Sequence, residues 1–457
     1  MDKQELLRLK PELDRFLDEF APLFGREENQ AHARVFVQGL LRGEDRRSCE
    51  NIAEAMDGGP VRTVQAFIAT GAWSDRAILG KMRQAVVGEL TDPDAVVNVD
   101  ETGFPKKGTK SVGVARMYSG TLGRVDNCQI GVFANYASAR GHTLIDRRLY
   151  LPEEWAEDKK RRKEAGVPES VIFRTKPDLG LEMIEQATQA GIPFRWVGGD
   201  CVYGGDPQFV QGVRMLEKWY VLDTKCDTQV WTSKPEVIPA DQRPKPPKGR
   251  CPTKPLVVGE RRRVDAVIAS LPPTAWRRVV VGEGTKGPRV YEYAEVVVWF
   301  TEDELPGPAE RLLARRSIGQ DPVIAYHRSN APAEIDLDKL AQVRGLRWTI
   351  EEDFQTSKGE CGLDEYETRG WVGWHHHTAL AMLALAFLVL QKHRLGKKRA
   401  PDDCARGPSF TLSSVGHSQM GYRRDPELVP LATGTKSPGG RQSPQKTTRS
   451  RVAACAL

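Results

Sequence analysis

The change in hydrophobic period near residue 90 is the feature that most constrains this fold. Up to about residue 88, apolar residues recur every three or four positions, as in "LLRLKPELDRFLDEF", which predicts amphipathic helices. From about residue 92, apolar residues come in short runs such as "AVVNVD" and "NCQIGVFANYAS", which predict strands. The sequence therefore predicts an all-helical domain over residues 1–88, followed by an α/β region.

The helical domain contains a candidate DNA-binding motif. In "SCENIAEAMDGGPVRTVQAFIATGAW", Ser48 is placed to cap one short helix, and "DGGP" separates that helix from a second. Two short helices around such a turn resemble a helix-turn-helix, whose second helix enters the major groove. Arg62, Thr63 and Gln65 would then contact DNA. An ordinary helical hairpin satisfies the same spacing.

The next segment, residues 92–225, alternates strands with helices. Strand-like runs are predicted at residues 96–100, 111–119, 127–138, 143–152, 194–200 and 219–224. A helix is predicted at 178–191, where Gly191 ends the periodic pattern. The charged run "EDKKRRKEAG" is predicted to be a solvated helix rather than a DNA clamp.

Residues 226–335 are predicted to form a β-rich insertion. The loop "PADQRPKPPKGRCPTKP" is rich in Pro and Lys, and "RRVVVGE", "VYEYAEVVVWF" and "PVIAYHRS" have the composition of strands. Residues 336–393 return to helix, first as one helix over about 335–358 and then as an apolar helix over about 374–392. Residues 394–457 have no periodicity and are predicted to be disordered.

Composition excludes several classes of protein. The formal net charge of +6 permits nucleic-acid binding without requiring it. None of the eight cysteines forms a C-x-x-C pair, so neither a zinc site nor a disulfide framework is predicted. The apolar run at 378–390 is too short to span a bilayer, and "GGPVRTVQ" lacks the Lys of a phosphate-binding loop. We therefore expect a cytoplasmic protein without a membrane partner or a nucleotide cofactor.

Two acidic residues follow hydrophobic strands. Asp100 ends "VVNVD", and Asp200 ends "FRWVGGD". Functional side chains project from the carboxyl ends of strands in α/β folds, although Asp is also common in turns. The next residue, Glu101, would point to the opposite face of its strand and is predicted to be a neighbour rather than a ligand.

A third acidic residue belongs to the helix predicted after the insertion. Arg347, Glu351 and Lys358 would lie within roughly 40° of one another around that helix. Ion pairs on an exposed helix give the same spacing. Trp348 and Phe354, however, predict that the helix is half-buried, and buried charges require partners or a metal.

Together these residues predict a metal-dependent site. Asp100, Asp200 and Glu351 offer hard oxygen ligands that suit Mg²⁺ or Mn²⁺. Two such ions about 4 Å apart would activate a water or a 3′-hydroxyl and stabilise the leaving oxygen of a phosphodiester. Arg347 and Lys358 would hold DNA phosphates.

The pattern resembles bacterial insertion-sequence transposases of the DDE class. "DETGFPKKG" and "GGDCVYG" resemble the surroundings of the first and second catalytic Asp, and Arg347-x3-Glu351-x6-Lys358 is similar to the Arg, Glu and Lys of the Tyr-Arg-Glu-Lys signature group. The resemblance covers roughly residues 5–392. It implies an RNase H-like nuclease core, interrupted by the β-rich insertion and completed by residues 336–393.

The resemblance also implies activity and partners. The chain would be a metal-dependent endonuclease with two ions per active site, which nicks double-stranded DNA at terminal inverted repeats and joins the 3′ ends to target DNA. It would act as a homodimer in the DNA complex and would be nucleoid-associated when bound.

Several positions depart from the family pattern or remain open. The signature Tyr is replaced by Arg344, which lies on the same predicted helix face and could contact phosphate. Lys106 and Lys107 could contact the DNA backbone, although a solvated turn is the simpler interpretation. Trp231 and Trp276 are candidates for base stacking, but core positions are the simpler interpretation.

Other functions stay open at this point. The "HHH" of residues 375–377 could bind a metal, but adjacent helical side chains point in different directions. A domesticated or decayed DNA-binding protein would keep the helix-turn-helix-like segment without catalysis. A structure-specific nuclease would keep the fold, but the long insertion argues against it.

Overall fold

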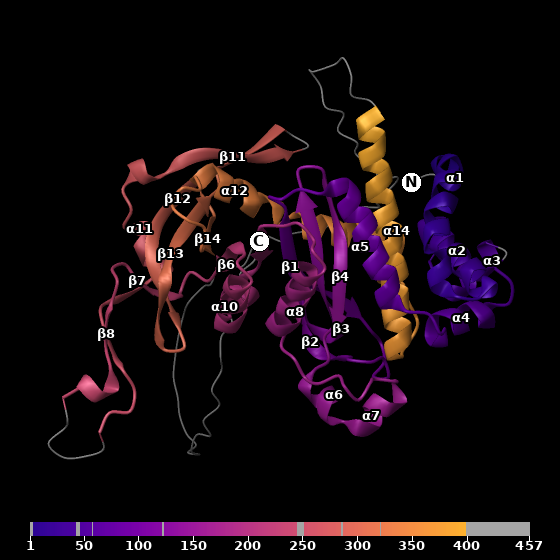
Figure 1. Ribbon diagram of the computed structural model, residues 1–457, viewed down its shortest axis with the longest axis horizontal. Helices are drawn as coiled ribbons and strands as arrows, with labels where there is room; N and C mark the ends of the chain where they lie inside the picture. Colours follow the sequence, from indigo (N-terminus) through magenta and orange to yellow (C-terminus); the bar gives the residue numbers. More distant parts are fainter. Residues whose placement is uncertain are drawn as a thin grey trace, which may run out of the picture. The chain divides into compact units, whose positions relative to one another are not determined.

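A computed structural model of the chain describes residues 3–42, 46–56, 58–120, 123–244, 251–284, 287–319 and 321–398 (Figure 1). Residues 399–457, most of the segment predicted to be disordered, lie outside the described residues. Residues 245–250 of the Pro- and Lys-rich loop lie outside them as well.

The amino-terminal region is helical, as predicted. Its elements are α1 (Lys3–Phe20), the 3₁₀ helix η1 (Ala21–Phe24), α2 (Glu27–Arg42), α3 (Cys49–Ala55), α4 (Val61–Thr70) and α5 (Asp75–Leu90). The Ser48 side chain accepts a hydrogen bond from the backbone N–H of Asn51 and so caps α3. The helices bury their apolar faces in the same hydrophobic core as the first strands, and Phe16 packs against Phe387 of the last helix.

A large mixed sheet follows these helices. Its first strands are β1 (Val96–Pro105), β2 (Ala115–Ser119), β3 (Arg124–Ser138), β4 (Gly141–Leu149), β5 (Trp196–Gly199) and β6 (Trp219–Thr224). β1 pairs antiparallel with β3 and parallel with β5, and β5 pairs parallel with β6. The chain is therefore a mixed α/β protein with amino-terminal helices.

The prediction that the first strand ends at Asp100 is wrong. β1 continues to Pro105 because its pairing with β3 extends without interruption to Cys128. Asp100 thus lies in the middle of a paired strand, which fixes its backbone more firmly than a turn would.

Helices connect these strands. They are α6 (Glu153–Glu157), α7 (Lys159–Glu164), α8 (Lys176–Gln189), α9 (Cys201–Gly204) and α10 (Pro207–Met215). α7 has no buried residue, which confirms that the charged run is a solvated helix. α8 begins with a capping box in which Thr175 and Asp178 each bond the other's backbone.

The β-rich segment extends the same sheet. Its elements are β7 (Gln229–Trp231), β8 (Glu236–Ile238), η2 (Ala240–Gln242), β9 (Leu256–Val258), β10 (Arg261–Arg263), α11 (Val264–Ala269), η3 (Pro273–Ala275), β11 (Arg277–Gly284), β12 (Gly287–Glu302), β13 (Leu305–Arg316) and β14 (Ile324–Ser329). β14 pairs with β6, which makes one 12-stranded sheet, and β8 and β9 form a separate pair. The sequence did not predict β13, because its first residues "LPGP" read as a loop.

The helix predicted over 335–358 is two helices, α12 (Leu337–Leu346) and α13 (Thr349–Cys361). In a continuous helix the carbonyl of Leu346 would accept from the N–H of Ile350. Instead it accepts from the side chains of Asn98 and Thr349, and the Ile350 N–H bonds to Arg347. The break leaves Trp348 half-exposed, so the prediction of a buried face is wrong for this residue.

The last helix, α14 (Trp371–Lys398), is longer than predicted. It packs against α2, α4, α5, α13 and β4, and Figure 1 shows it between the amino-terminal helices and the sheet. Residues 371–396 are long and apolar enough to cross a bilayer, but 78% of that apolar window is buried inside the protein. The helix is thus the central core element, as predicted for the shorter run.

His142 on β4 joins the sheet to α13 and makes the stability of the protein depend on pH. Its ring nitrogens lie 2.8 Å from Asp353 and 3.3 Å from Glu352. Burial opposes protonation, but the hydrogen bonds that the protonated ring donates to these two carboxylates raise the pKa of His142 to about 9. The folded protein therefore holds a proton on His142 that the unfolded chain, with a pKa near 6.5, releases at lower pH.

We expect this contribution to be complete below about pH 6.5 and to be lost as the pH rises to about 9, by at most about 3 kcal/mol. Urea denaturation of the native protein and of His142→Gln at several pH values measures it. The native protein should lose free energy of unfolding over this range relative to the variant. Parallel pH profiles in the two proteins would contradict the assignment.

Candidate active site

Three acidic residues lie at the same level of the sheet, where parallel strands β1, β5 and β6 run side by side. Val99 is in register with Gly199, and Gly199 is in register with Leu222. The residues that follow these three positions are Asp100, Asp200 and Asp223. The sheet therefore brings together the two predicted Asp residues and adds a third.

A glycine in β5 and two asparagine side chains bring β1, β5 and the start of α13 close together. A Cβ atom on Gly198 would lie 2.0 Å from Oδ1 of Asn98, so only glycine fits beside β1 at this position. The Asn98 amide donates to Asn135 and to the carbonyl of Leu346. Asn135 in turn donates to Thr349 at the start of α13. These bonds hold the beginning of α13, and with it Glu351, beside β1.

Arg347 lies among the carboxylates. Its guanidinium is 2.9 Å from Asp100, 3.8 Å from Glu351 and 3.8 Å from Asp223. The structure thus brings Asp100, Glu351 and Arg347 together in one partly buried cluster, and Asp200 acts electrostatically on both Asp100 and Arg347.

The proton affinities of the two predicted Asp residues reflect this crowding. Burial raises the pKa of Asp100 well above its usual range, Arg347 opposes that shift, and the charges of Asp200 and Glu351 add to it. Burial and the neighbouring charge of Glu101 likewise raise the pKa of Asp200. A cation bound between these partly buried carboxylates would offset their mutual repulsion.

Asp223 and its partner His327 were not predicted from the sequence. Its carboxylate lies 2.7 Å from Nδ1 of His327 and 2.8 Å from Nε of Arg344. Burial alone would raise the pKa of Asp223, but Arg344, His327 and Arg347 together lower it far below its usual range. The available signal was "WYVLD", a hydrophobic run followed by an acid, as in the other two strands.

Arg344 is buried in this ion pair. Its side chain is 11% exposed and donates to Asp223, and it lies beside the His327 ring. The predicted contact of Arg344 with phosphate therefore finds no support in the structure. The guanidinium at the position of the signature Tyr instead neutralises a buried carboxylate next to Arg347.

The three lysines predicted to contact DNA lie in different environments. Lys358 donates to Thr102 of β1, so it lies beside the strand that carries Asp100. Lys106 lies 3.5 Å from the ring centroid of Tyr366, and burial lowers its pKa to about 8. A solvated turn is thus the wrong interpretation for Lys106, whereas Lys107 is exposed.

Glu101 lies on the opposite face of β1 from the cluster. Its carboxylate is 2.5 Å from Nζ of Lys176 and accepts a hydrogen bond from the Tyr203 hydroxyl. Asp200 caps α9 through the backbone N–H of Val202. Asp100 and Glu101 therefore bond different partners, although the charge of Glu101 also raises the pKa of Asp100.

The remaining candidates lie away from the carboxylates. Arg62, Thr63 and Gln65 are exposed on α4. Trp231 is buried in the core beneath Arg261, and Trp276 is half-buried beneath Arg316. The histidines of residues 375–377 bond to different backbone carbonyls rather than to a common centre.

The donor set fits a hard divalent cation by its chemistry. Asp100, Asp200 and Glu351 supply carboxylate oxygens, which Mg²⁺ and Mn²⁺ prefer. Among the described residues, no three His, Cys, Asp or Glu side chains are already grouped as a metal site. Arg347, which pairs with Asp100, provides the positive charge of the cluster.

Comparison with known proteins identifies the class. Residues 19–288 match the family described as "DDE superfamily endonuclease". This is more than half of the chain, and the protein therefore belongs to the DDE endonuclease family. The matched region includes Asp100 and Asp200 but ends before Glu351.

One curated relative is a probable transposase for insertion sequence element IS701 from Microchaete diplosiphon. The two chains are 27% identical over 203 residues, which cover 44% of this chain and 49% of the relative. The chain thus matches about half the length of that relative. The resemblance to insertion-sequence transposases is confirmed at the level of the family.

Solved structures align more distantly. A piggyBac transposase synaptic complex with hairpin DNA aligns with a TM-score of 0.40 and 11% identity, over 82% of this chain and 67% of that chain. The NurA nuclease from Sulfolobus solfataricus aligns with a TM-score of 0.24 and 8% identity, over 61% of this chain and 85% of that chain.

Proposed function

We propose that this protein is a DDE transposase that cuts DNA at the ends of its element and transfers the strands into target DNA. The observation that carries the proposal is the convergence of Asp100, Asp200 and Glu351 around Arg347. The strand order β4-β3-β1-β5-β6, with β3 antiparallel to its neighbours, supports an RNase H-like core.

Asp100, Asp200 and Glu351 would hold two Mg²⁺ or Mn²⁺ ions. When bound, such ions activate the attacking oxygen and stabilise the leaving oxygen of a phosphodiester. Arg347 offers a planar cation to a DNA phosphate beside the acids, and Asp223 keeps that guanidinium oriented. Lys358, fixed by Thr102, offers a second positive charge.

The other residues proposed to contact DNA are chosen because their side chains are exposed. Arg62, Thr63 and Gln65 present polar groups on one helix, and Lys107 lies in the exposed turn after β1. These residues would bind double-stranded DNA of the terminal inverted repeats, with two copies of the chain in the DNA complex.

Metal dependence tests the proposal. Purified protein is incubated with a DNA fragment that carries the repeats flanking its gene, with Mg²⁺, with Mn²⁺ or with EDTA. We expect nicks at the repeat boundaries with either metal and none with EDTA, because the carboxylates repel the phosphate without a cation. Scrambled ends of equal length serve as the control.

Two other results would replace the proposal. A protein that shifts the repeat DNA but never nicks it with either metal is a non-catalytic DNA-binding protein. Cleavage of branched DNA without preference for the repeats indicates a structure-specific nuclease.

A further inference from the structure

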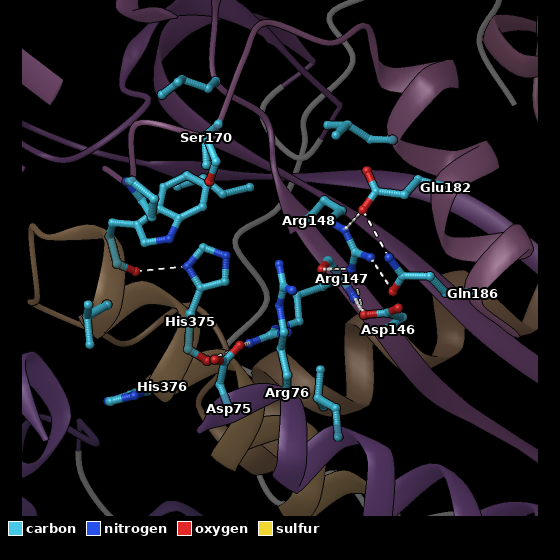
Figure 2. A pocket seen from close by; sticks show the side chains of 18 of the residues that line it. Asp75, Arg76, Asp146, Arg147, Arg148, Ser170, Glu182, Gln186, His375 and His376 are labelled. Carbon is cyan, nitrogen blue, oxygen red and sulfur yellow. Dashed lines mark hydrogen bonds and ion pairs between the residues drawn. The ribbon is translucent and has the colours of Figure 1, made fainter. Parts of the chain in front are cut away.

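A cavity of about 570 Å³ lies at β4, away from the carboxylate cluster (Figure 2). Its walls come from β4, α8, the segment 168–174 and the first turns of α5 and α14. None of Asp100, Asp200 and Glu351 lines it. Its volume is within the range of about 300–1,000 Å³ that is typical of small-molecule sites.

The cavity is separated from the active site by one strand of the sheet, β3. Arg147 in its wall is in register with Phe133, which is in register with Asp100. These positions are two strand spacings apart, or about 10 Å. Phe133 is fully buried and packs against Phe354. The cavity is therefore a distinct site rather than an extension of the cluster.

Arginine dominates the charge of the lining. Five arginines and three carboxylates line the cavity, which leaves an excess of two positive charges. The arginines are Arg76, Arg83, Arg147, Arg148 and Arg174.

The three carboxylates are already neutralised by these arginines. Asp75 lies 2.7 Å from Arg147, and Asp146 lies 3.1 Å from Arg83 and 2.8 Å from Arg148. The third, Glu182, pairs with Arg148 at 3.2 Å and with Arg174 at 2.9 Å. The excess positive charge therefore belongs to arginines that are unpaired or that share a carboxylate with another arginine.

Arg76 carries one of these two excess charges. It is exposed, and Figure 2 shows its side chain extending from α5 into the cavity without a marked interaction. Within the described part of the chain, Arg76 has no ion pair or hydrogen bond. Arg174 is 44% exposed and, among the described residues, pairs through one nitrogen with Glu182.

The helices add to the positive potential. α5 has 16 residues and α14 has 28, and the first turn of each lines the cavity. The amino-terminal end of a helix carries partial positive charge and favours anions. His375 lies in this wall, and burial lowers its pKa to about 3. The cavity thus offers arginines and helix ends to an anion.

We propose that this cavity binds a phosphate group, carried by a nucleotide or by a DNA strand. Guanidinium groups match the geometry of phosphate oxygens and bond them in pairs. Arg76 and Arg174 would supply those donors, while Arg148 and Arg147 keep their internal partners. The site is independent of the proposed cleavage chemistry, because no residue of the carboxylate cluster takes part.

Calorimetric titration of the full chain with inorganic pyrophosphate tests the proposal. EDTA is present throughout, so that a metal at the carboxylates cannot bind the probe. We expect Arg76→Gln to weaken binding about tenfold, the loss of one charge-assisted hydrogen bond. Arg116→Gln on β2 removes an exposed arginine outside the cavity and should bind like the native protein.

A matched pair at Ser170 makes the test specific to the cavity. Ser170 is exposed and lines the cavity, so both substitutions can be accommodated. Ser170→Glu should abolish binding by adding a negative charge, whereas Ser170→Gln, of nearly equal size, should leave most of it. Thermal unfolding of each variant confirms that the fold is retained.

The source of the phosphate is decided by two further titrations, with dAMP and with a 12-nucleotide single strand of unrelated sequence. Tighter binding of dAMP than of the strand, lost in Ser170→Glu, supports a nucleotide site. The reverse order, with the same loss, supports a strand site. The proposal is overturned if pyrophosphate does not bind at millimolar concentration, or if Arg76→Gln and Ser170→Glu bind it like the native protein.

Discussion

Asp100→Asn is expected to reduce metal-dependent cleavage of DNA carrying the element's ends on the order of a thousandfold or more, while DNA binding persists. The amide keeps the size of the side chain but removes the negative charge that would hold a cation. It also leaves Arg347 paired with Asp223 and Glu351, so the fold should survive. A nicking assay under Mg²⁺ and a gel-shift assay with the same DNA measure the two quantities.

Glu101→Gln is the matched control, because it changes the adjacent residue by the same chemistry. Glu101 bonds Lys176 and Tyr203 on the other face of β1. Its amide variant should therefore keep cleavage within a few-fold of the native rate. If Asp100→Asn cuts at the native rate, or Glu101→Gln is the inactive variant, the proposed site is wrong.

Glu310→Gln is expected to lower the free energy of unfolding by about 3–5 kcal/mol, since it breaks a buried ion pair. Glu310 on β13 is 3% exposed and accepts from Arg328 on β14 at 2.5 and 2.9 Å. Arg328 also donates to the carbonyl of Gly204 in α9. The substitution would leave Arg328 buried with an incomplete set of partners. Urea denaturation measures the loss.

Two further variants separate this effect from general damage. Glu304→Gln removes one partner of an exposed pair with Lys254 and should change the stability little, because solvent screens that pair. Replacing both buried partners, as in Glu310→Leu with Arg328→Met, should recover most of the stability, because no unpaired charge remains. A Glu310→Gln protein as stable as the Glu304→Gln control would show that the buried pair contributes little.

Local patterns predicted much of the fold. The amino-terminal helices, β1, β3, β6 and α8 follow from hydrophobic period and from capping residues such as Ser48, which act within a few positions. β13 escaped detection because Pro306 and Pro308 near its start resemble a loop. Its pairing with β12 and β14 overrides that local signal.

The features that the sequence did not predict depend on contacts between residues far apart in the chain. α12 and α13 separate because Asn98, 248 positions away in sequence, takes the carbonyl of Leu346. Asp223 joins the site because β6 lies parallel to β5, a register that hydrophobic pattern does not specify. The arginine-lined cavity likewise assembles from several separate segments. Asp100 and Asp200 were predicted because each follows a hydrophobic run, and Glu351 because it shares a helix face with Arg347 and Lys358.

The joining of β14 to β6 has a mechanical consequence. β12 and β13 form a long antiparallel pair that is hydrogen-bonded, through β14, to the strand that carries Asp223. A force applied at the β12–β13 turn therefore reaches Asp223 through successive ladders of backbone hydrogen bonds rather than through a flexible tether. The β12–β13 hairpin and the acids are therefore parts of one continuous hydrogen-bonded sheet, so a displacement of the hairpin would be transmitted to β6.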